Sequence, residues 1–291
     1  MITDTLISVL TQGLIYGFIA FGLLITYKIL DFPDLTVDGS FPLGAAVTAV
    51  LIIKGINPAL CIVISFGAGV LAGLATGIIH IKFGIRDLLA GIITMTGLFS
   101  INLKIAGSNL PIPRTYETVY TMLNIPGMSL MGRKLLLAAV LALFFKLMLD
   151  MYFKTKSGLL LRAVGDNSLL VTTLAKDNGR VKILGLALAN GLVAVAGSLV
   201  AQEQRAFSAT MGTGQVVFGL AAVIIGTTIF KKLDFVKGTT AAIVGSILYK
   251  GCIQVAILMG LDANLLNLIT ALLFLLILIL GNAKKGGSAN A

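Results

Sequence analysis

Long apolar stretches, separated by short polar connections, run along almost the whole chain. A helix that crosses a bilayer needs roughly 20 mostly apolar residues, because a hydrocarbon core of about 30 Å is spanned at 1.5 Å per residue. The pattern predicts about nine segments, at residues 5–27, 41–53, 59–80, 88–106, 134–153, 181–202, 215–230, 238–259 and 264–281. We therefore expect an all-α, polytopic membrane helix bundle that forms a single transmembrane domain over residues 1–291.

The distribution of lysine and arginine predicts how this bundle is oriented. The connection 154–182 holds six of these residues, and an excess of Lys and Arg is typical of cytoplasmic connections. If 154–182 is cytosolic, alternation puts the basic connections 80–87 and 231–237 on the same side. The N-terminus is then expected outside and the C-terminus in the cytosol.

Two of the segments are interrupted and short. Pro33, Gly39 and Pro42 argue against a continuous helix from 27 to 45, because proline removes a backbone donor and crowds the preceding turn. The segment 215–230, which follows a glycine-containing stretch, is short as well. Short segments in corresponding positions of two halves with opposite orientation suggest an inverted repeat and a translocation pathway at the interruptions.

Polar side chains at the two interruptions are the candidates for the pathway: Asp34, Thr36, Asp38, Ser40 and Thr213. Non-helical backbone at membrane depth either lines a cavity or is buried in protein. Asp34, Thr36 and Asp38 are equally suited to capping the helix that follows, so both roles stay open. An acidic cluster suits the ammonium group of an amino acid, or an ion pair with Lys28.

The connection 154–182 contains a short amphipathic helix by its pattern. Asp166 or Asn167 is suited to cap its start and the pair Asn178–Gly179 to end it. Such a helix lies on the lipid surface or docks into a groove of a partner protein. In the docking interpretation, the residues that couple to the partner are Asp166, Leu169, Leu170, Thr173 and Leu174.

A few polar or small residues within the spans have simpler interpretations. Lys146 has Asp150 one helical turn later as an ion-pair partner, and for Lys250 we expect a structural or dimer-contact role. Polar residues in apolar runs, such as Asn102, Asn190 and Gln202, are expected to form hydrogen bonds between helices. The glycines at 69, 73 and 77 have the spacing of a close helix–helix contact.

Composition and charge exclude several classes of function. A mean hydropathy of +1.02 and 57% apolar residues leave no room for a soluble domain. The net charge of +10 comes from the connections between spans, so nucleic acid is not an expected partner. Cys61 and Cys252 have no metal-site spacing, and the chain has no phosphate-binding G-x-x-x-x-G-K-[ST] motif. Neither catalytic residues nor a cofactor or metal is expected.

Several ordered motifs resemble one family of membrane proteins, the permease subunits of binding-protein-dependent ABC importers of the branched-chain amino acid and ribose class. Similar pieces are the stretches 13–22, 34–40, 158–165, 219–226 and 238–245. The stretch Phe32–Gly39 looks like the branch that is linked to amino-acid uptake, aromatic amino acids included.

The resemblance implies a pore subunit of an ATP-driven importer of the bacterial cytoplasmic membrane, with a small polar solute, most simply an amino acid, as its cargo. Two permease protomers, expected to be identical, would form the pore. Two cytosolic ATPases would bind the helix 166–178, and an extracytoplasmic substrate-binding protein would deliver the solute. The alternative is a self-contained secondary transporter, which would leave the amphipathic connection without a purpose.

Overall fold

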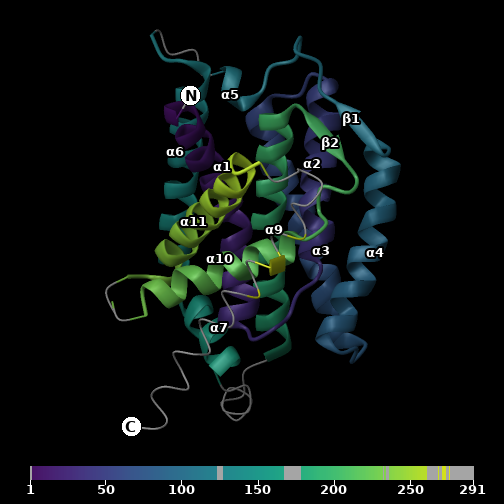
Figure 1. The fold of residues 1–291 in the computed structure, drawn as a ribbon. Coiled ribbons are helices and arrows are strands. Elements are labelled where there is room, and N and C mark those ends of the chain that lie inside the picture. Colours follow the sequence, from purple (N-terminus) through teal and green to yellow (C-terminus); the bar gives the residue numbers. More distant parts are fainter. Residues whose placement is uncertain are drawn as a thin grey trace.

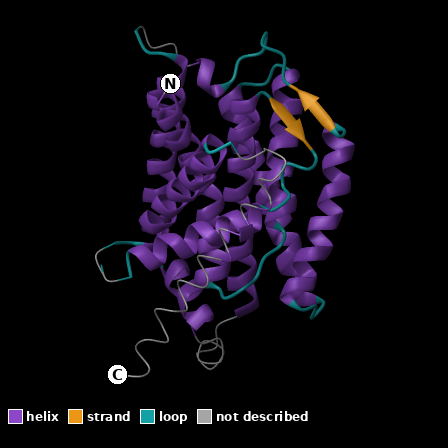
Figure 2. Cartoon of the chain, in the orientation of Figure 1, coloured by secondary structure: helices purple, strands orange, loops and turns teal. Residues whose placement is uncertain are grey.

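The computed structural model describes residues 2–122, 127–166, 178–231, 233, 236–260, 268, 271–272 and 275. Nearly all of this part is helical (Figures 1 and 2). The elements are α1 (Ile2–Leu23), the short π-helix η1 (Leu24–Ile29), α2 (Val37–Ile53), α3 (Pro58–Lys82), α4 (Asp87–Ala106), β1 (Asn109–Pro111), α5 (Val119–Met122), α6 (Leu130–Tyr152), α7 (Lys156–Asp166), α9 (Asn178–Gln204), β2 (Ala206–Ser208), α10 (Gln215–Ile229) and α11 (Gly238–Leu258).

The lengths of these helices confirm an all-α polytopic bundle. Within the described residues, six helices are long and apolar enough to cross a membrane: α1 with η1, α3, α4, α6, α9 and α11. The two shorter apolar helices are α2 and α10, which are the two segments predicted to be short. The expected span 264–281 lies outside the residues that the structure describes, apart from isolated positions.

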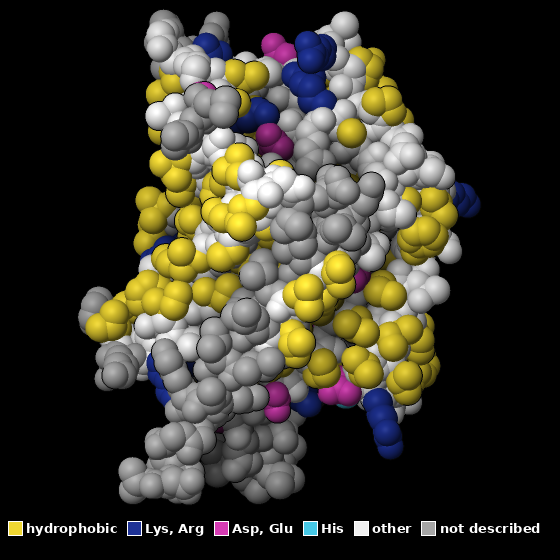
Figure 3. All heavy atoms as spheres, viewed as in Figure 1, with side chains coloured by type: hydrophobic (Ala, Val, Ile, Leu, Met, Phe, Trp, Pro, Cys, Tyr) yellow, Lys and Arg dark blue, Asp and Glu magenta, His cyan; other side chains and the backbone are white. Residues whose placement is uncertain are grey.

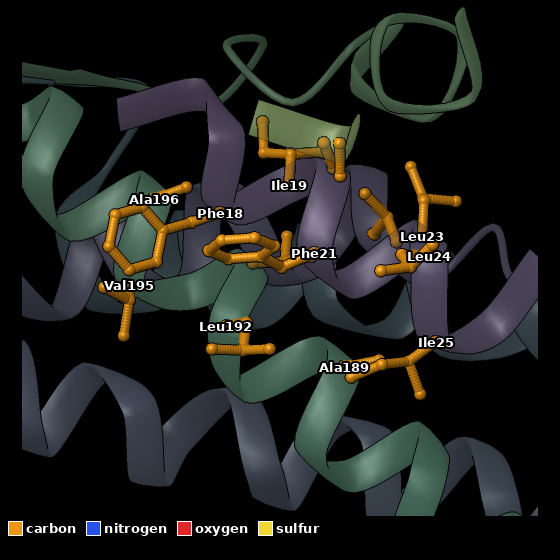
Figure 4. Packing of buried hydrophobic residues seen from close by; sticks show 14 of the residues in the cluster. Phe18, Ile19, Phe21, Leu23, Leu24, Ile25, Ala189, Leu192, Val195 and Ala196 are labelled. Atoms are coloured by element: carbon orange, nitrogen blue, oxygen red, sulfur yellow. The ribbon is translucent and has the colours of Figure 1, made fainter. Parts of the chain in front are cut away.

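Helix α9 occupies the centre of the bundle and packs against α1, α2 and α3. Figure 4 shows Phe18 and Phe21 of α1 against Leu192 and Val195 of α9, all of them buried. The outer helices α4, α6 and α11 instead expose large apolar side chains. On the visible surface, hydrophobic side chains spread over the middle and charged ones lie mainly near the two ends (Figure 3), as a helix bundle in a bilayer requires.

Helices α3 and α9 lie in direct backbone contact, as the glycine spacing predicts. A Cβ atom added at Gly69 would come within 2.3 Å of the Asn190 carbonyl oxygen, and one at Gly73 within 2.2 Å of the Leu186 carbonyl oxygen. These positions therefore have no room for any side chain. In lipid, where the hydrophobic effect does not drive helices together, such close contacts stabilise the pair through van der Waals packing.

Two local expectations need correction. The break after α1 is confined to residues 30–36, and Gly39 and Pro42 lie inside α2, where the proline removes only one helical hydrogen bond. Asn178 begins α9 instead of ending a helix, since asparagine suits either end. Asp166 is the last residue of α7, and the helix that it was expected to cap lies outside the described residues.

A small antiparallel pair of strands was not expected from the sequence. Strand β1 pairs with β2, with Leu110 opposite Phe207, and the Arg205 guanidinium donates hydrogen bonds to the Pro113 and Tyr116 carbonyls at 3.2 and 3.0 Å. Strands of three residues are too short for the alternation of apolar and polar positions that reveals a strand in a sequence.

Candidate translocation site

The chain leaves the helical conformation at the end of η1 and re-enters it at α2. Asp31 adopts a left-handed backbone conformation with φ of 51°, and the Phe32 N–H donates back to the Thr26 carbonyl at 2.8 Å. Asp34 then accepts a hydrogen bond from the Thr36 N–H at its Oδ1 atom, at 2.8 Å. This bond stabilises the turn that precedes α2, whose N-cap residue, Thr36, has no side-chain cap of its own.

A buried hydrogen-bond network holds this break against α3 and α9. Asn190 of α9 is its centre: its Nδ2 atom donates to Asp34 Oδ2 at 2.7 Å, and its Oδ1 atom accepts from Ser40 Oγ at 2.7 Å. The hydroxyl groups of Thr36 and Thr76 are 2.7 Å apart. Each of these side chains is at most 1% exposed. Because these polar groups are buried and hydrogen-bonded, the network holds the break in a single conformation: breaking any of the bonds would leave a buried group unpaired.

Asp38 joins the two interruptions. Its Oδ1 atom accepts from the Val216 N–H at 2.8 Å and its Oδ2 atom from the Gly214 N–H at 3.2 Å. A carboxylate at this position caps the N-terminus of α10 and favours the positive end of its dipole. Asp38 therefore does cap a helix, but the helix is a distant one and not its own α2.

The backbones of the two interrupted segments also approach each other closely at this contact. Gly214 has φ of 83°, in the region that favours glycine. A Cβ atom at Gly212 would come within 2.0 Å of the Asp38 carbonyl oxygen. Within α2 this carbonyl receives no helical hydrogen bond from residue 42, because proline has no backbone N–H group. The two short segments that the sequence predicts to lie on the pathway thus meet in space.

A cavity of about 270 Å³ lies beside this meeting point, between α2, α4 and the connection that precedes α10. Its lining consists of Asp38, Gly39, Pro42, Met95, Thr96, Phe99, Ala209 and Thr213. Two of the five candidate pathway residues, Asp38 and Thr213, therefore face an open space. Asp34, Thr36 and Ser40 are instead buried in the network next to it.

Three residues join this site from outside the two interruptions. Asn190 and Asn102 were expected to bond between helices, and they do: Asn102 donates to the Gly39 carbonyl at 3.2 Å. The Oδ1 atom of Asn102 is buried and has no hydrogen-bond partner in the described part of the chain. Thr76 was missed, because a threonine in an apolar helix commonly bonds its own backbone and gives no signal.

Two lysines lie within the spans. Lys146 pairs with Asp150 at 3.1 Å as predicted, and Asp150 also accepts from Lys237 at 2.9 Å. Lys250 of α11 points onto aromatic faces, with its Nζ atom 3.3 Å from the centroid of the Tyr16 ring and 5.2 Å from that of Phe218. Cation–π contacts of this kind compensate part of the desolvation of an intramembrane ammonium group.

The predicted coupling residues fall mostly outside the described part of the chain. Leu169, Leu170, Thr173 and Leu174 lie outside the described residues, and Asp166 is exposed at the end of α7. Helix α7 itself packs against η1 and α9. Its Gly165 lies so close to the Ile29 carbonyl oxygen that a Cβ atom there would come within 1.7 Å of it.

Comparison with known proteins gives a consistent result. The family model described as the permease component of a branched-chain amino acid transport system matches residues 5–280. A tyrosine transport system permease protein of Clostridioides difficile is 43% identical, over 95% of this chain and 91% of that protein. An uncharacterized protein of Rickettsia prowazekii is 32% identical, over 91% of this chain and 94% of that protein. The ribose import permease protein of Bacillus subtilis is 28% identical, over 77% of this chain and 68% of that protein.

Fold, site and relatives agree on a multi-pass protein of the bacterial inner membrane that is not itself an enzyme. The family match extends over the spanning helices, and the relatives align over most of their length. This chain belongs to the permease components of branched-chain amino acid transport systems, and it is the pore subunit of an ABC importer of small solutes whose ATPase is a separate chain.

Proposed function

We propose that this protein imports an amino acid, with tyrosine or another aromatic amino acid as the best-supported cargo. The observation that supports this cargo most directly is the 43% identity, over 95% of the chain, to a tyrosine transport system permease protein. A ribose import permease matches at 28% and over a smaller share. We place the N-terminus outside and the C-terminus in the cytosol, because the basic connections then lie on the cytosolic side.

The proposed pathway passes the contact between α2 and α10. Asp38 and Thr213 face the 270 Å³ cavity there, and a carboxylate that accepts two backbone N–H groups still has lone pairs for a further donor. The ammonium group of an amino acid is such a donor. In this proposal Asp34, Thr36 and Ser40 do not touch the solute. They hold the walls of the pathway in place through the hydrogen-bond network centred on Asn190.

The proposed coupling to ATP hydrolysis starts in the segment 154–182. A cytosolic ATPase would bind the surface formed by Asp166, Leu169, Leu170, Thr173 and Leu174, within a single transmembrane domain over residues 1–291. The close contact between Gly165 and the Ile29 carbonyl would pass a movement of α7 to the break at 30–36. Two identical protomers, two ATPases and an extracytoplasmic binding protein would complete the importer.

Reconstitution tests this assignment. The permease, together with its partner ATPase and substrate-binding protein, is placed in liposomes that contain ATP, and uptake of labelled tyrosine, leucine and ribose is compared. We expect ATP-dependent uptake of tyrosine and a complex with two copies of this chain. Uptake of ribose without any amino acid would contradict the cargo, and gradient-driven uptake by this chain alone would contradict its role as an ATP-driven pore.

A further inference from the structure

A second, larger cavity lies at the opposite end of α1 from its N-terminus and is separate from the site described above. It measures about 510 Å³ and lies between η1, the C-terminal ends of α6 and α7, and the start of α11. Leu24, Ile29, Phe153 and Gly238 contribute apolar or neutral walls, and the charged lining consists of Lys28, Asp150, Lys154, Arg162, Asp166 and Lys237. Basic side chains thus outnumber acidic ones by four to two.

The acidic group deepest in this lining is already neutralised. Asp150 accepts from Lys146 at 3.1 Å, from Lys237 at 2.9 Å and from the Thr239 hydroxyl at 2.6 Å. Its capacity for hydrogen bonds is therefore largely used, and it offers little attraction to the remaining cations of the cavity. The pair with Lys237 also joins the end of α6 to the start of α11, which fixes that side of the cavity.

Three basic side chains of the lining are left without an acidic partner in the described part of the chain. Lys28, Lys154 and Arg162 form no ion pair there. Arg162 is positioned by a cation–π contact, with its guanidinium carbon 5.1 Å from the centroid of the Phe153 ring. Arg and Lys presented together on the wall of one cavity suit a phosphate group, for which the planar guanidinium provides paired donors.

An apolar stripe on α6 extends along the helix as far as the turn that contains Asp150, a residue of the cavity lining. Its members share one helix face and are exposed: Val140, Leu143, Phe144, Leu147, Met148 and Met151. Asp150, which lines the cavity, follows Leu147 by three residues and therefore lies beside the edge of this stripe. A ligand that occupies both regions has a phosphate at one end and long apolar chains at the other.

We propose that this basic cavity binds the phosphodiester group of an anionic phospholipid, whose acyl chains lie along the exposed stripe of α6. Basic pockets between helix ends at the level of the headgroups have the position and the charge for such lipids. Free phosphate shares the headgroup's chemistry but makes no use of the stripe. The inference does not depend on the cargo or on the orientation of the protein, since both leaflets present phosphates.

The test compares two double variants that lose the same charge. Lys28→Gln/Lys154→Gln removes two cations of the cavity, and Lys82→Gln/Lys231→Gln removes two exposed lysines outside its lining. Each complete transporter, purified in detergent, is titrated with short-chain phosphatidylglycerol, with phosphatidylcholine and with inorganic phosphate. Bound molecules are counted by native mass spectrometry. We expect roughly 10- to 30-fold weaker binding of phosphatidylglycerol in the cavity variant and little change in the control.

The other outcomes overturn the proposal. Equal loss in both double variants would mean that only the general surface charge attracts the lipid. Equally tight binding of inorganic phosphate would identify a site for a free anion. Loss of the ATPase from the purified cavity variant would identify the cavity as a protein contact. If the double variant does not fold, Lys28→Gln alone is compared with Lys82→Gln, and unchanged lipid binding then overturns the proposal equally.

Discussion

At the scale of single residues, the interrupted segments depend on a few polar side chains that each serve a structural purpose. Asp34 accepts a hydrogen bond from the backbone two residues later, in the turn before α2. Asp38 instead caps α10, through an N–H group that lies 178 positions further along the chain. Local spacing identifies both as helix-capping types, but it contains no information on which helix lies within reach. For that reason the sequence left the two roles of this cluster open.

The burial of these residues predicts which of them a reagent can reach. In a Cys252→Ser background, which removes the exposed native thiol, Thr213→Cys should react readily with a small polar thiol reagent. Ser40→Cys should react roughly 100-fold more slowly, because its fully buried position must first open at a cost of about 3 kcal/mol. The rates are measured by mass spectrometry of the complete importer with and without ATP. Protection of Thr213→Cys in every state would contradict its place on the pathway.

At the scale of helices, most of the fold follows from the sequence. The long spans lie within a few residues of their predicted bounds, because apolar length is set directly by bilayer thickness. The misses are short elements: α5, the strands β1 and β2, and α7, which directly follows a predicted span. For the packing between helices, the glycine pattern of α3 predicted a contact face but no partner, and the structure identifies α9 as that partner.

Two glycines of α3 give a matched test of this contact. Gly73→Ala should lower the free energy of unfolding by about 1–3 kcal/mol, because its methyl group has no room against the Leu186 carbonyl. A methyl group added at Gly67 would meet nothing within 4 Å, so Gly67→Ala should raise the stability by about 0.5–1 kcal/mol through helix propensity. Unfolding in detergent, followed by circular dichroism against denaturant, measures both. The same sign for both variants would contradict close packing as the role of Gly73.

At the scale of the whole molecule, one chain of contacts joins α7 to the candidate pathway. Helix α7 lies against the Ile29 carbonyl through Gly165. Residues 30–36 follow directly, and Asp34 in this stretch is bonded to Asn190 of the central helix α9. Asp38 then connects the start of α2 to α10. A displacement of α7 therefore has a short route, through packed backbone and satisfied polar groups, to both interruptions.

This route predicts the effect of substitutions in the proposed coupling segment that follows α7. Leu170→Asp/Leu174→Asp places two charges on the apolar face of the predicted coupling helix, and we expect the ATPase to be lost from the purified complex, because an unpaired charge cannot enter an apolar groove without a large desolvation cost. Thr172→Asp adds a charge to the other face of the same helix and should retain the ATPase. Co-purification and membrane insertion are measured together, so that a failure to insert is distinguished from a failure to dock. If the double variant keeps the ATPase in normal amount, the result favours the interpretation that this helix lies on the lipid surface. The ATPase must then move α7 through another contact, such as the one at Ile29.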